Sequence, residues 1–360
     1  MRFPEFSGEW NKCTINDLAT VVGGGTPDTT VKSYWGGDIQ WFTPSEIGKN
    51  KYVDFSLRTI TRDGLDNSSS KLLPLHTILL SSRATVGECS IASNECTTNQ
   101  GFQSLIAKQC NIDFLYYLIQ TKKKDLIRNA CGSTFLEISA NEIRKIKVAV
   151  PVQNEQEQIA KLLSLIDERI ATQNKIIEKL QSLIKGLAAQ LTQSGTPNIR
   201  LCDCLECHSS TLQENCVSVT GSYPVYGATG LIGYTNNYAY NGESILIVKD
   251  GSGVGSLSYV NDHFSVIGTL NYLTAKENYS ILYLYYALMA FNFTPYITGM
   301  AIPHIYFKDY GKAKLFYPSI EKRIRIASLL HNIEQKLVVE QNLVISLSAQ
   351  KSYLLRMLFI

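Results

Sequence analysis

The chain has 360 residues, 45% of them hydrophobic and 18% charged, and its formal net charge is +3. It can therefore hold two domains with separate cores, but it is less basic than proteins that bind nucleic acid unaided. No apolar run is long enough to span a membrane, and the first ten residues lack the basic-then-apolar order of a signal peptide. We expect a cytoplasmic protein whose nine cysteines are reduced thiols.

Residues 1–150 are predicted to form the first domain. The stretch TVGECSIAS at 85–93 indicates a glycine turn followed by a strand, and NIDFLYYLIQ at 111–120 has the periodicity of an amphipathic helix. The segment carries 17 basic and 15 acidic residues, so it has no strong excess of either charge. These signals predict a mixed α/β domain.

Residues 151–195 are predicted to form one long helix. It begins just after Pro151, and apolar residues recur at heptad spacing from Ile159 to Leu191. A helix of about 40 residues spans roughly 60 Å, which is too long to be covered by one small domain. A second long helix is therefore expected to cover the apolar stripe.

Residues 196–317 are predicted to form a second domain of the same kind. The glycine turn returns as GVGSLSYVN at 253–261, and Gly299 aligns with Gly132 when the sequence is shifted by 167 positions. This segment holds only 6 basic and 8 acidic residues, so it offers few cations for phosphate groups. The chain is therefore interpreted as two half-repeats, each a mixed α/β domain followed by a long helix.

The stretch LCDCLECH at 201–208 offers Cys202, Cys204, Cys207 and His208 as possible metal ligands. Their spacing fits no standard zinc knuckle, and no second cysteine pair follows at the distance that a zinc finger needs. Cysteines that alternate with acidic residues indicate a strand instead. We therefore predict no metal site.

Residues 318–360 are predicted to form the second long helix, antiparallel to the first. Its start, PSIEKRIRIASLLHNIE, shares six of seventeen residues with PVQNEQEQIAKLLSLID at 151–167. The apolar stripe breaks at the same height in both helices, at Gln173 and at Glu340, with Arg169 and Lys336 one turn away. These four residues are predicted to fix the register of a coiled coil, with Glu340 facing Arg169 and Gln173 facing Lys336. The alternative is that each helix packs only on its own domain.

No catalytic constellation is visible in the sequence. The chain lacks the Asn-Pro-Pro-Tyr or Asp-Pro-Pro-Tyr stretch of amino-methylating enzymes, and it lacks the G-x-x-x-x-G-K-[ST] phosphate loop. The glycines of DGSGVGS at 250–256 fail the G-x-G-x-x-G spacing and are interpreted as a tight turn. We therefore predict no catalytic residue and no cofactor in this chain.

In their order along the chain, these segments resemble the specificity subunit of type I restriction-modification enzymes. RFPEFSGEW at 2–10 is similar to the opening phrase of that family, and GGGTPD followed by YWGGDIQWFTPSEI, within 23–47, is similar to its first target-recognition domain. TVGECSIASNECTTNQGFQSLI at 85–106 and ISANEIRKIKVAVPVQNEQEQIAKLLSLID at 138–167 match later parts of that domain and its exit into the helix. YPVYGATGLIGYTNNYAYNGESILI at 223–247 is similar to another recognition-domain type. The resemblance covers essentially the whole chain.

The resemblance implies a mixed α+β fold of two target-recognition domains in pseudo-twofold tandem repeat, separated by two long antiparallel coiled-coil helices. Each domain would read one half of an asymmetric, bipartite site in double-stranded DNA. Two methyltransferase subunits would grip the helices and supply S-adenosylmethionine and catalysis, and a motor-nuclease subunit can join them. The second domain is shorter than the first, so its readout surface is expected to be smaller.

Base reading needs polar side chains on loops that reach the major groove. By position we expect such DNA contacts from nine residues of the two domains. They are Lys32, Ser82, Arg83, Ser133 and Thr134 in the first domain, and Thr229, Lys249, Ser252 and His304 in the second. For each of them, a solvated loop residue is the alternative interpretation.

Two other functions stay open at this point. The chain could be a non-catalytic two-domain coiled-coil scaffold that binds only protein, or an enzyme whose site the sequence does not reveal. A DNA mobility-shift assay with and without a methyltransferase partner tests the first alternative. Turnover by the isolated chain would reveal the second.

Overall fold

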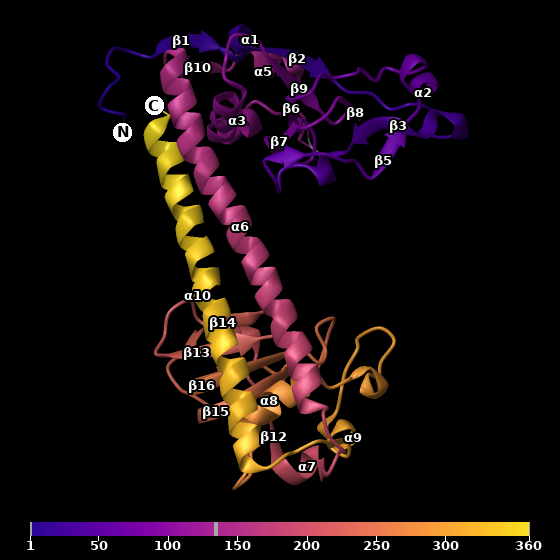
Figure 1. Ribbon diagram of the computed structural model, residues 1–360, viewed down its shortest axis with the longest axis vertical. Helices are drawn as coiled ribbons and strands as arrows, with labels where there is room; N and C mark the ends of the chain where they lie inside the picture. Colours follow the sequence, from indigo (N-terminus) through magenta and orange to yellow (C-terminus); the bar gives the residue numbers. More distant parts are fainter. Residues whose placement is uncertain (1, 133–135, 360) are drawn as a thin grey trace. The chain divides into compact units, whose positions relative to one another are not determined.

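The computed structural model describes residues 2–132 and 136–359, and the chain divides into two compact units (Figure 1). Unit 1 comprises residues 1–173 and 343–360, and unit 2 comprises residues 174–342. The divisions fall inside the two long helices, α6 (Gln153–Thr192) and α10 (Ile320–Leu358), so each unit contains one domain and part of both helices. Both predicted long helices are confirmed. No helix among the described residues is long and apolar enough to cross a bilayer.

The domain of unit 1 is built on a five-stranded sheet in the order β2-β9-β6-β7-β4. Its strands are β2 (Ala19–Gly23), β4 (Tyr52–Val53), β6 (Ile78–Leu80), β7 (Cys89–Ala92) and β9 (Gln103–Ala107). Neighbouring strands are antiparallel, except that β4 runs parallel to β7. The side chain of Asn111 accepts the backbone N–H of Phe114 and so caps α3 (Ile112–Thr121), whose buried side chains join the core beside this sheet.

The domain of unit 2 repeats this topology. Its sheet has the order β12-β17-β15-β16-β13-β14. The strands are β12 (Leu205–Ser209), β13 (Tyr223–Gly227), β14 (Gly230–Thr235), β15 (Tyr240–Val248), β16 (Leu257–Val266) and β17 (Leu270–Ala275). The first five strands in this order have the directions seen in unit 1, including the parallel pair, here β13 with β16. α8 (Ile281–Met289), capped by Ser280, takes the place of α3. The predicted internal repeat is therefore confirmed.

Short elements close each domain in the same way. In unit 1, β1 (Asn11–Thr14) pairs with β10 (Lys147–Val150), and in unit 2, β11 (Ile199–Arg200) pairs with β18 (Lys314–Leu315). Each of these pairs joins the segment that enters a domain to the segment that leaves it just before a long helix. The remaining helices are α1 (Ile15–Leu18), α4 (Lys123–Arg128), α5 (Ala140–Lys145), α7 (Leu201–Cys204) and α9 (Phe307–Tyr310).

Unit 1 contains a second, three-stranded sheet in the order β5-β3-β8, which unit 2 does not repeat among its described strands. Its strands are β3 (Trp35–Phe42), β5 (Arg58–Ile60) and β8 (Cys96–Thr98). The 3-10 turn Lys32–Tyr34 and α2 (Arg62–Asp66) flank it. Each domain thus has its own main sheet of equivalent topology, and the domains differ in the strands that are added to these sheets.

The long helices pack antiparallel within each unit. In unit 1, Leu358 near the end of α10 lies in one core with Ile159 and Leu163 near the start of α6. In unit 2, Ala188 near the end of α6 lies in one core with Leu330 of α10. Both cores also include the domain helix, α3 or α8, so each pair of helix segments packs on a domain as well as on itself. The predicted antiparallel packing is confirmed within each unit.

A carboxylate on the long helix accepts tyrosine hydroxyls from the domain helix in both units. In unit 1, Tyr117 donates to Asp167 (2.7 Å), which also pairs with Lys351 of α10 (2.6 Å). In unit 2, Tyr285 and Tyr286 donate to Glu334 at 2.9 and 2.7 Å. Asp167 and Glu334 stand at the same position of the sequence repeat. Burial raises the pKa of these tyrosines above the ordinary value, so their hydroxyls stay protonated and able to donate.

Replacing the unit 1 carboxylate should destabilise that unit. Asp167→Ala leaves the Tyr117 hydroxyl with only a 3.4 Å contact to Ser164 and the mostly buried ammonium of Lys351 without its carboxylate, so we expect the free energy of unfolding to fall by about 2–3 kcal/mol. Chemical denaturation measures the free energy of unfolding, and hydrogen exchange of the backbone amides in α3 measures the local effect. The exposed neighbour Glu168, replaced by Ala, is the control and should change stability by less than about 0.5 kcal/mol. Equal effects of the two variants would contradict a structural role for Asp167.

Candidate nucleic-acid interface

Two loops of unit 1 that are far apart in sequence are bound together by backbone hydrogen bonds. The N–H of Ala84, in the turn after β6, donates to the carbonyl of Leu136 (3.1 Å), and the N–H of Ile138 donates to the carbonyl of Ser82 (2.9 Å). Cys131 and Glu137 exchange two further backbone bonds, each of 2.9 Å. These contacts fix the backbone and leave outward side chains free to vary.

Unit 2 contains the same loop pair. The N–H of Gly251 donates to Pro303 and that of Ile305 donates to Lys249, both at 2.9 Å. Thr298 and His304 exchange backbone bonds of 2.9 and 2.8 Å, as Cys131 and Glu137 do in unit 1. Every one of these bonds in unit 2 lies 167 positions after its counterpart in unit 1. The loop pairs are therefore equivalent in the two domains.

Glycine is required where these loops turn. Gly132 and Gly299, which align in the repeat, have φ values of +132° and +91°. At Gly299 a Cβ atom would also lie 2.3 Å from the carbonyl oxygen of Ile302. A side chain at this position would strain the backbone and force the loop to move.

The structure brings several predicted DNA-contact residues together on these loop pairs. In unit 1, Arg83 is exposed, and its guanidinium lies 3.9 Å from the carboxylate of Glu137. In unit 2, Ser252 is exposed and His304 is half-buried, with its ring against that of Tyr306. Lys249 is half-buried.

Ser82 is a correction to the sequence interpretation. Its side chain is fully buried, and its hydroxyl has no hydrogen-bond partner among the described residues. The reason is its place on the inward side of the loop, where its carbonyl binds Ile138 and its N–H donates to Gly101. Its side chain is therefore not at the surface, as a base contact would require.

Other predicted contacts lie apart from the loop pairs. Thr229 is exposed in the turn between β13 and β14, and Lys32 is exposed in the 3-10 turn before β3. Ser133 and Thr134 lie outside the described residues. Contacts of the surface residues with DNA stay predictions.

Two residues of the predicted polar layer, Gln173 and Glu340, are largely buried in the long helices. Gln173 is 7% exposed, and the side chain of Glu340 is 13% exposed. Glu340 pairs with Lys336 of its own helix at 2.9 Å, while Arg169 is exposed. The predicted pairs between the helices join residues of different units and stay predictions.

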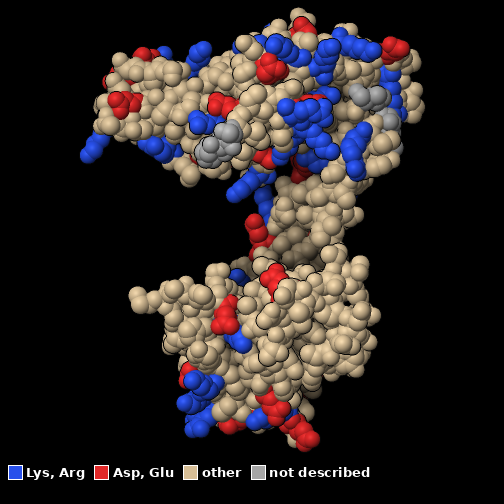
Figure 2. Space-filling model, turned by 180° about the vertical axis from the view of Figure 1, so that it is seen from behind, with Lys and Arg blue, Asp and Glu red and all other residues tan. Residues whose placement is uncertain are grey.

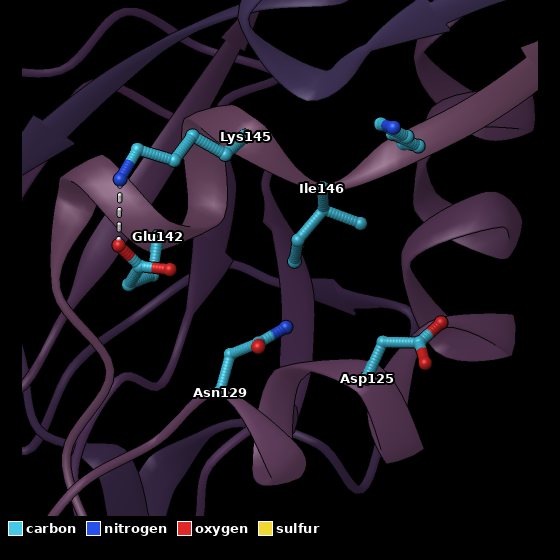
Figure 3. Close-up of a pocket in the computed structure, with 6 residues that line it drawn as sticks. Asp125, Asn129, Glu142, Lys145 and Ile146 are labelled. Carbon is cyan, nitrogen blue, oxygen red and sulfur yellow. Dashed lines mark hydrogen bonds and ion pairs between the residues drawn. The ribbon is translucent and has the colours of Figure 1, made fainter.

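The face shown in Figure 2 carries many Lys and Arg side chains on unit 1 and few on unit 2. A pocket of about 350 Å³ in unit 1 lies between α4 and α5 and holds charges of both signs (Figure 3). Lys145 binds Glu142 there at 2.9 Å, and Asp125 faces the same space. Because carboxylates line it, this pocket does not offer a purely cationic site for phosphate.

The cysteine-rich stretch of unit 2 also differs from expectation. Leu201–Cys204 forms the helical turn α7, and the strand begins only at Leu205. Leu201 and Cys204, three residues apart, are both buried on the inner side of this turn. Within the described residues, no three His, Cys, Asp or Glu side chains are grouped so that they could hold a metal ion.

Sequence reasoning missed two groups of residues. The acceptor role of Asp167 and Glu334 could have been suspected, because both carboxylates fall at one repeat position opposite tyrosine-rich helices. The contact of Arg58 with Trp35 could not have been predicted from the sequence, because it depends on how β3 and β5 pair.

The comparisons with known proteins agree with this architecture. The model of the type I restriction modification DNA specificity domain matches residues 7–182 and 199–347. The type I restriction enzyme EcoprrI specificity subunit of Escherichia coli is 25% identical over 361 residues, which is 91% of this chain and 87% of that protein. The MjaIX specificity subunit of Methanocaldococcus jannaschii is 39% identical over 183 residues, 48% of this chain and 42% of that protein. The chain thus matches less than half of the length of this archaeal relative.

Solved structures show the same fold. A type I restriction-modification S subunit from M. genitalium has a TM-score of 0.67 at 19% identity, with 100% of this chain and 99% of that chain covered. A chain from a second type I restriction-modification structure has a TM-score of 0.58 at 13% identity, with 98% of both chains covered. Because the family model matches both halves, the chain belongs to the type I restriction-modification DNA specificity family.

Proposed function

We propose that this protein is the DNA-recognition subunit of a type I restriction-modification complex and reads a bipartite, asymmetric site. The observation that carries the proposal is the loop pair built twice, once in each domain that matches the DNA specificity family. The loops have equivalent backbones but different side chains, for example Glu137 in one and His304 in the other. Different side chains on equivalent loops would read different half-sites.

The charge of the chain supports a function inside a complex. Residues 196–317 carry 6 basic and 8 acidic side chains, so this domain has no excess of positive charge with which to neutralise DNA phosphates. A protein partner would supply the missing electrostatic attraction. We infer that methyltransferase subunits do so, and that they also provide S-adenosylmethionine and catalysis; a motor-nuclease subunit completes complexes that cut DNA.

The long helix α10 offers apolar side chains for such partners. In unit 2 it exposes Ile324, Val338 and Val339, and in unit 1 it exposes Ile345 and Tyr353. Within unit 2, Ile324 and Val338 are separated by two heptads, so they lie on one line of the helix, away from buried Leu330. We infer that methyltransferase subunits cover this line.

The double variant Val338→Glu and Val339→Glu tests the docking surface. Two charges at a covered apolar contact should weaken association with the methyltransferase subunit about tenfold or more, because they would lose their hydration. Co-purification and size-exclusion chromatography of the complex measure this loss. Gln341→Glu adds a charge to an exposed neighbouring residue and should leave assembly unchanged. Normal assembly of the double variant would place the partner elsewhere.

A test of the whole proposal uses the full chain with its methyltransferase partner. Methylome sequencing of a host that carries both should reveal one asymmetric motif made of two half-sites. Highly purified chain alone should transfer no methyl group and cut no DNA. Methyl transfer by the isolated chain that is lost on mutating one of its residues would overturn the proposal.

The competing function is a scaffold that binds only protein. Mobility-shift assays with and without the methyltransferase separate the two ideas. Sequence-specific retention of DNA by the complex supports recognition. Assembly without any DNA preference supports the scaffold.

The spacing between half-sites should depend on α6. This helix is the continuous connection from the first domain to the second, so we propose that its length sets the gap. Inserting four residues near Ala171 should lengthen the gap between half-sites or abolish methylation, while both half-site sequences stay unchanged. Methylome sequencing of the variant measures the gap. A changed half-site sequence with the original gap would contradict this role.

The polar residues of the coiled coil should matter more for register than for stability. Replacing Gln173 and Glu340 together with Leu removes polar groups that are at most 13% exposed, so the melting temperature should stay equal or rise. We also expect methylation at sites with more than one spacer length, since a polar layer selects against shifted registers. A much lower melting temperature with an unchanged spacer would show that the two residues support the core instead.

A further inference from the structure

The three-stranded sheet of unit 1 carries an arginine stacked on tryptophan. Figure 1 shows β3, β5 and α2 on the side of unit 1 away from α6. Unit 2 has no described strands that repeat this sheet. It is therefore a place where the recognition surfaces of the two domains differ.

The stack depends on a bulge in β3. Trp35 and Trp41 are six residues apart, which is about 20 Å along a regular strand. Their rings nevertheless lie 5.0 Å apart, edge to face. The cause is that Trp35 and Ile39 both stand opposite Ile60, so the residues between them loop out of the ladder.

Glycines make this bulge possible. Gly36 has a φ of +83°, which favours glycine over any residue with a side chain. A Cβ atom at Gly37 would lie 2.5 Å from the carbonyl oxygen of Ile60 on β5. Both glycines of the motif YWGGDIQW thus serve to bring the two tryptophans together.

Both indoles are fixed by hydrogen bonds to the loop before β3. Trp41 donates its Nε1–H to the carbonyl of Gly25 (2.9 Å), and Trp35 donates to that of Asp28 (3.1 Å). The carboxylate of Asp28 accepts from the hydroxyl and the backbone N–H of Thr30, which lower its pKa. This carboxylate is therefore bonded within its own turn.

Arg58 stands opposite Trp41 on β5, and its guanidinium carbon lies 3.6 Å from the ring centre of Trp35. The side chain is exposed. Within the described ranges the guanidinium has no ion pair and donates no hydrogen bond to a protein acceptor, whereas nearby Arg62 pairs with Asp66. A fixed, exposed and unpaired guanidinium has its donors available for a ligand.

We propose that Arg58 reads a guanine in the half-site recognised by the first domain, by donating two hydrogen bonds to the O6 and N7 atoms of that base. This inference rests on the proposed function. Stacking on Trp35 holds the guanidinium plane before binding, so little side-chain freedom is lost when the pair of hydrogen bonds forms. The rigid, planar arginine fork fits the two acceptors of guanine in the major groove, whereas the flexible ammonium of lysine is a point charge without that fixed geometry. Because the described strands of unit 2 form no equivalent sheet, this contact contributes to the asymmetry of the site.

The test uses the full chain in complex with its methyltransferase partner and methylome sequencing. Arg58→Lys keeps the charge but loses the fork, so discrimination at one G·C pair of one half-site should fall about 10- to 100-fold. All other positions, including the second half-site, should stay as in the wild type. Arg62→Lys, an exposed arginine on adjacent α2, is the matched control and should leave the motif unchanged.

Arg58→Met adds a variant that keeps much of the packing but no charge, and it should relax the same position. If the Met variant does not fold, the Lys variant alone decides. An unchanged motif with both variants would overturn the assignment, as would equal loss of methylation at every site, which indicates a phosphate contact. Loss of complex assembly would show a protein contact and also overturn it. A wild-type complex that methylates no defined motif would instead overturn the proposed function itself.

Discussion

Each unit depends on the hydrogen bonds that join tyrosines of its domain helix to a carboxylate of its long helix. Asp167 and Glu334 are the acceptors that receive tyrosine hydroxyls from α3 and α8. A partly buried carboxylate needs such donors, because it has lost much of its hydration. These hydrogen bonds restrict the angle at which a domain helix can lie on a long helix, and apolar packing alone would restrict it less. One loop of each pair follows α3 or α8 in the chain, so its position depends on that angle.

The loops themselves are specified mainly through their backbones. Bonds such as Ala84 to Leu136, and Gly251 to Pro303, join main-chain groups. Every residue has the carbonyl acceptor, and every residue except proline has the N–H donor. A side chain can therefore change without loss of the loop conformation, except at positions with positive φ such as Gly132, Gly251 and Gly299. Such an arrangement suits a protein whose scaffold must stay constant while its binding preference changes.

The sequence predicted the helices and the duplication well, because both are local or repeated signals. The apolar stripe from Ile159 to Leu191 repeats every seven residues, so it can be recognised without knowing what the helix packs against. Strand order could not be predicted in the same way, since strands such as β4 and β7 pair across long stretches of chain. Leu201–Cys204 was misinterpreted because a short alternating pattern fits both a strand and a helical turn with two inward residues.

The candidate site was predicted only in part, for similar reasons. Arg83, Ser252 and His304 do lie on the paired loops, since the repeat and its glycines mark those loops in the sequence. Ser82 faces inward, and one residue of difference along a loop decides between interior and surface. Arg58 was missed because its stack with Trp35 arises from a bulge that places distant residues against each other.

The division of the chain inside both helices has a consequence for the order of folding during synthesis. Unit 2 is one continuous segment, residues 174–342, whereas unit 1 needs residues 343–360 as well. Leu358 is 3% exposed in the core of unit 1, and Phe359 stacks on Phe114 at 5.1 Å. During synthesis, part of the apolar surface of the first domain therefore stays exposed until residues 343–360, which follow the second domain, have been made. A chaperone can bind this apolar surface during that time.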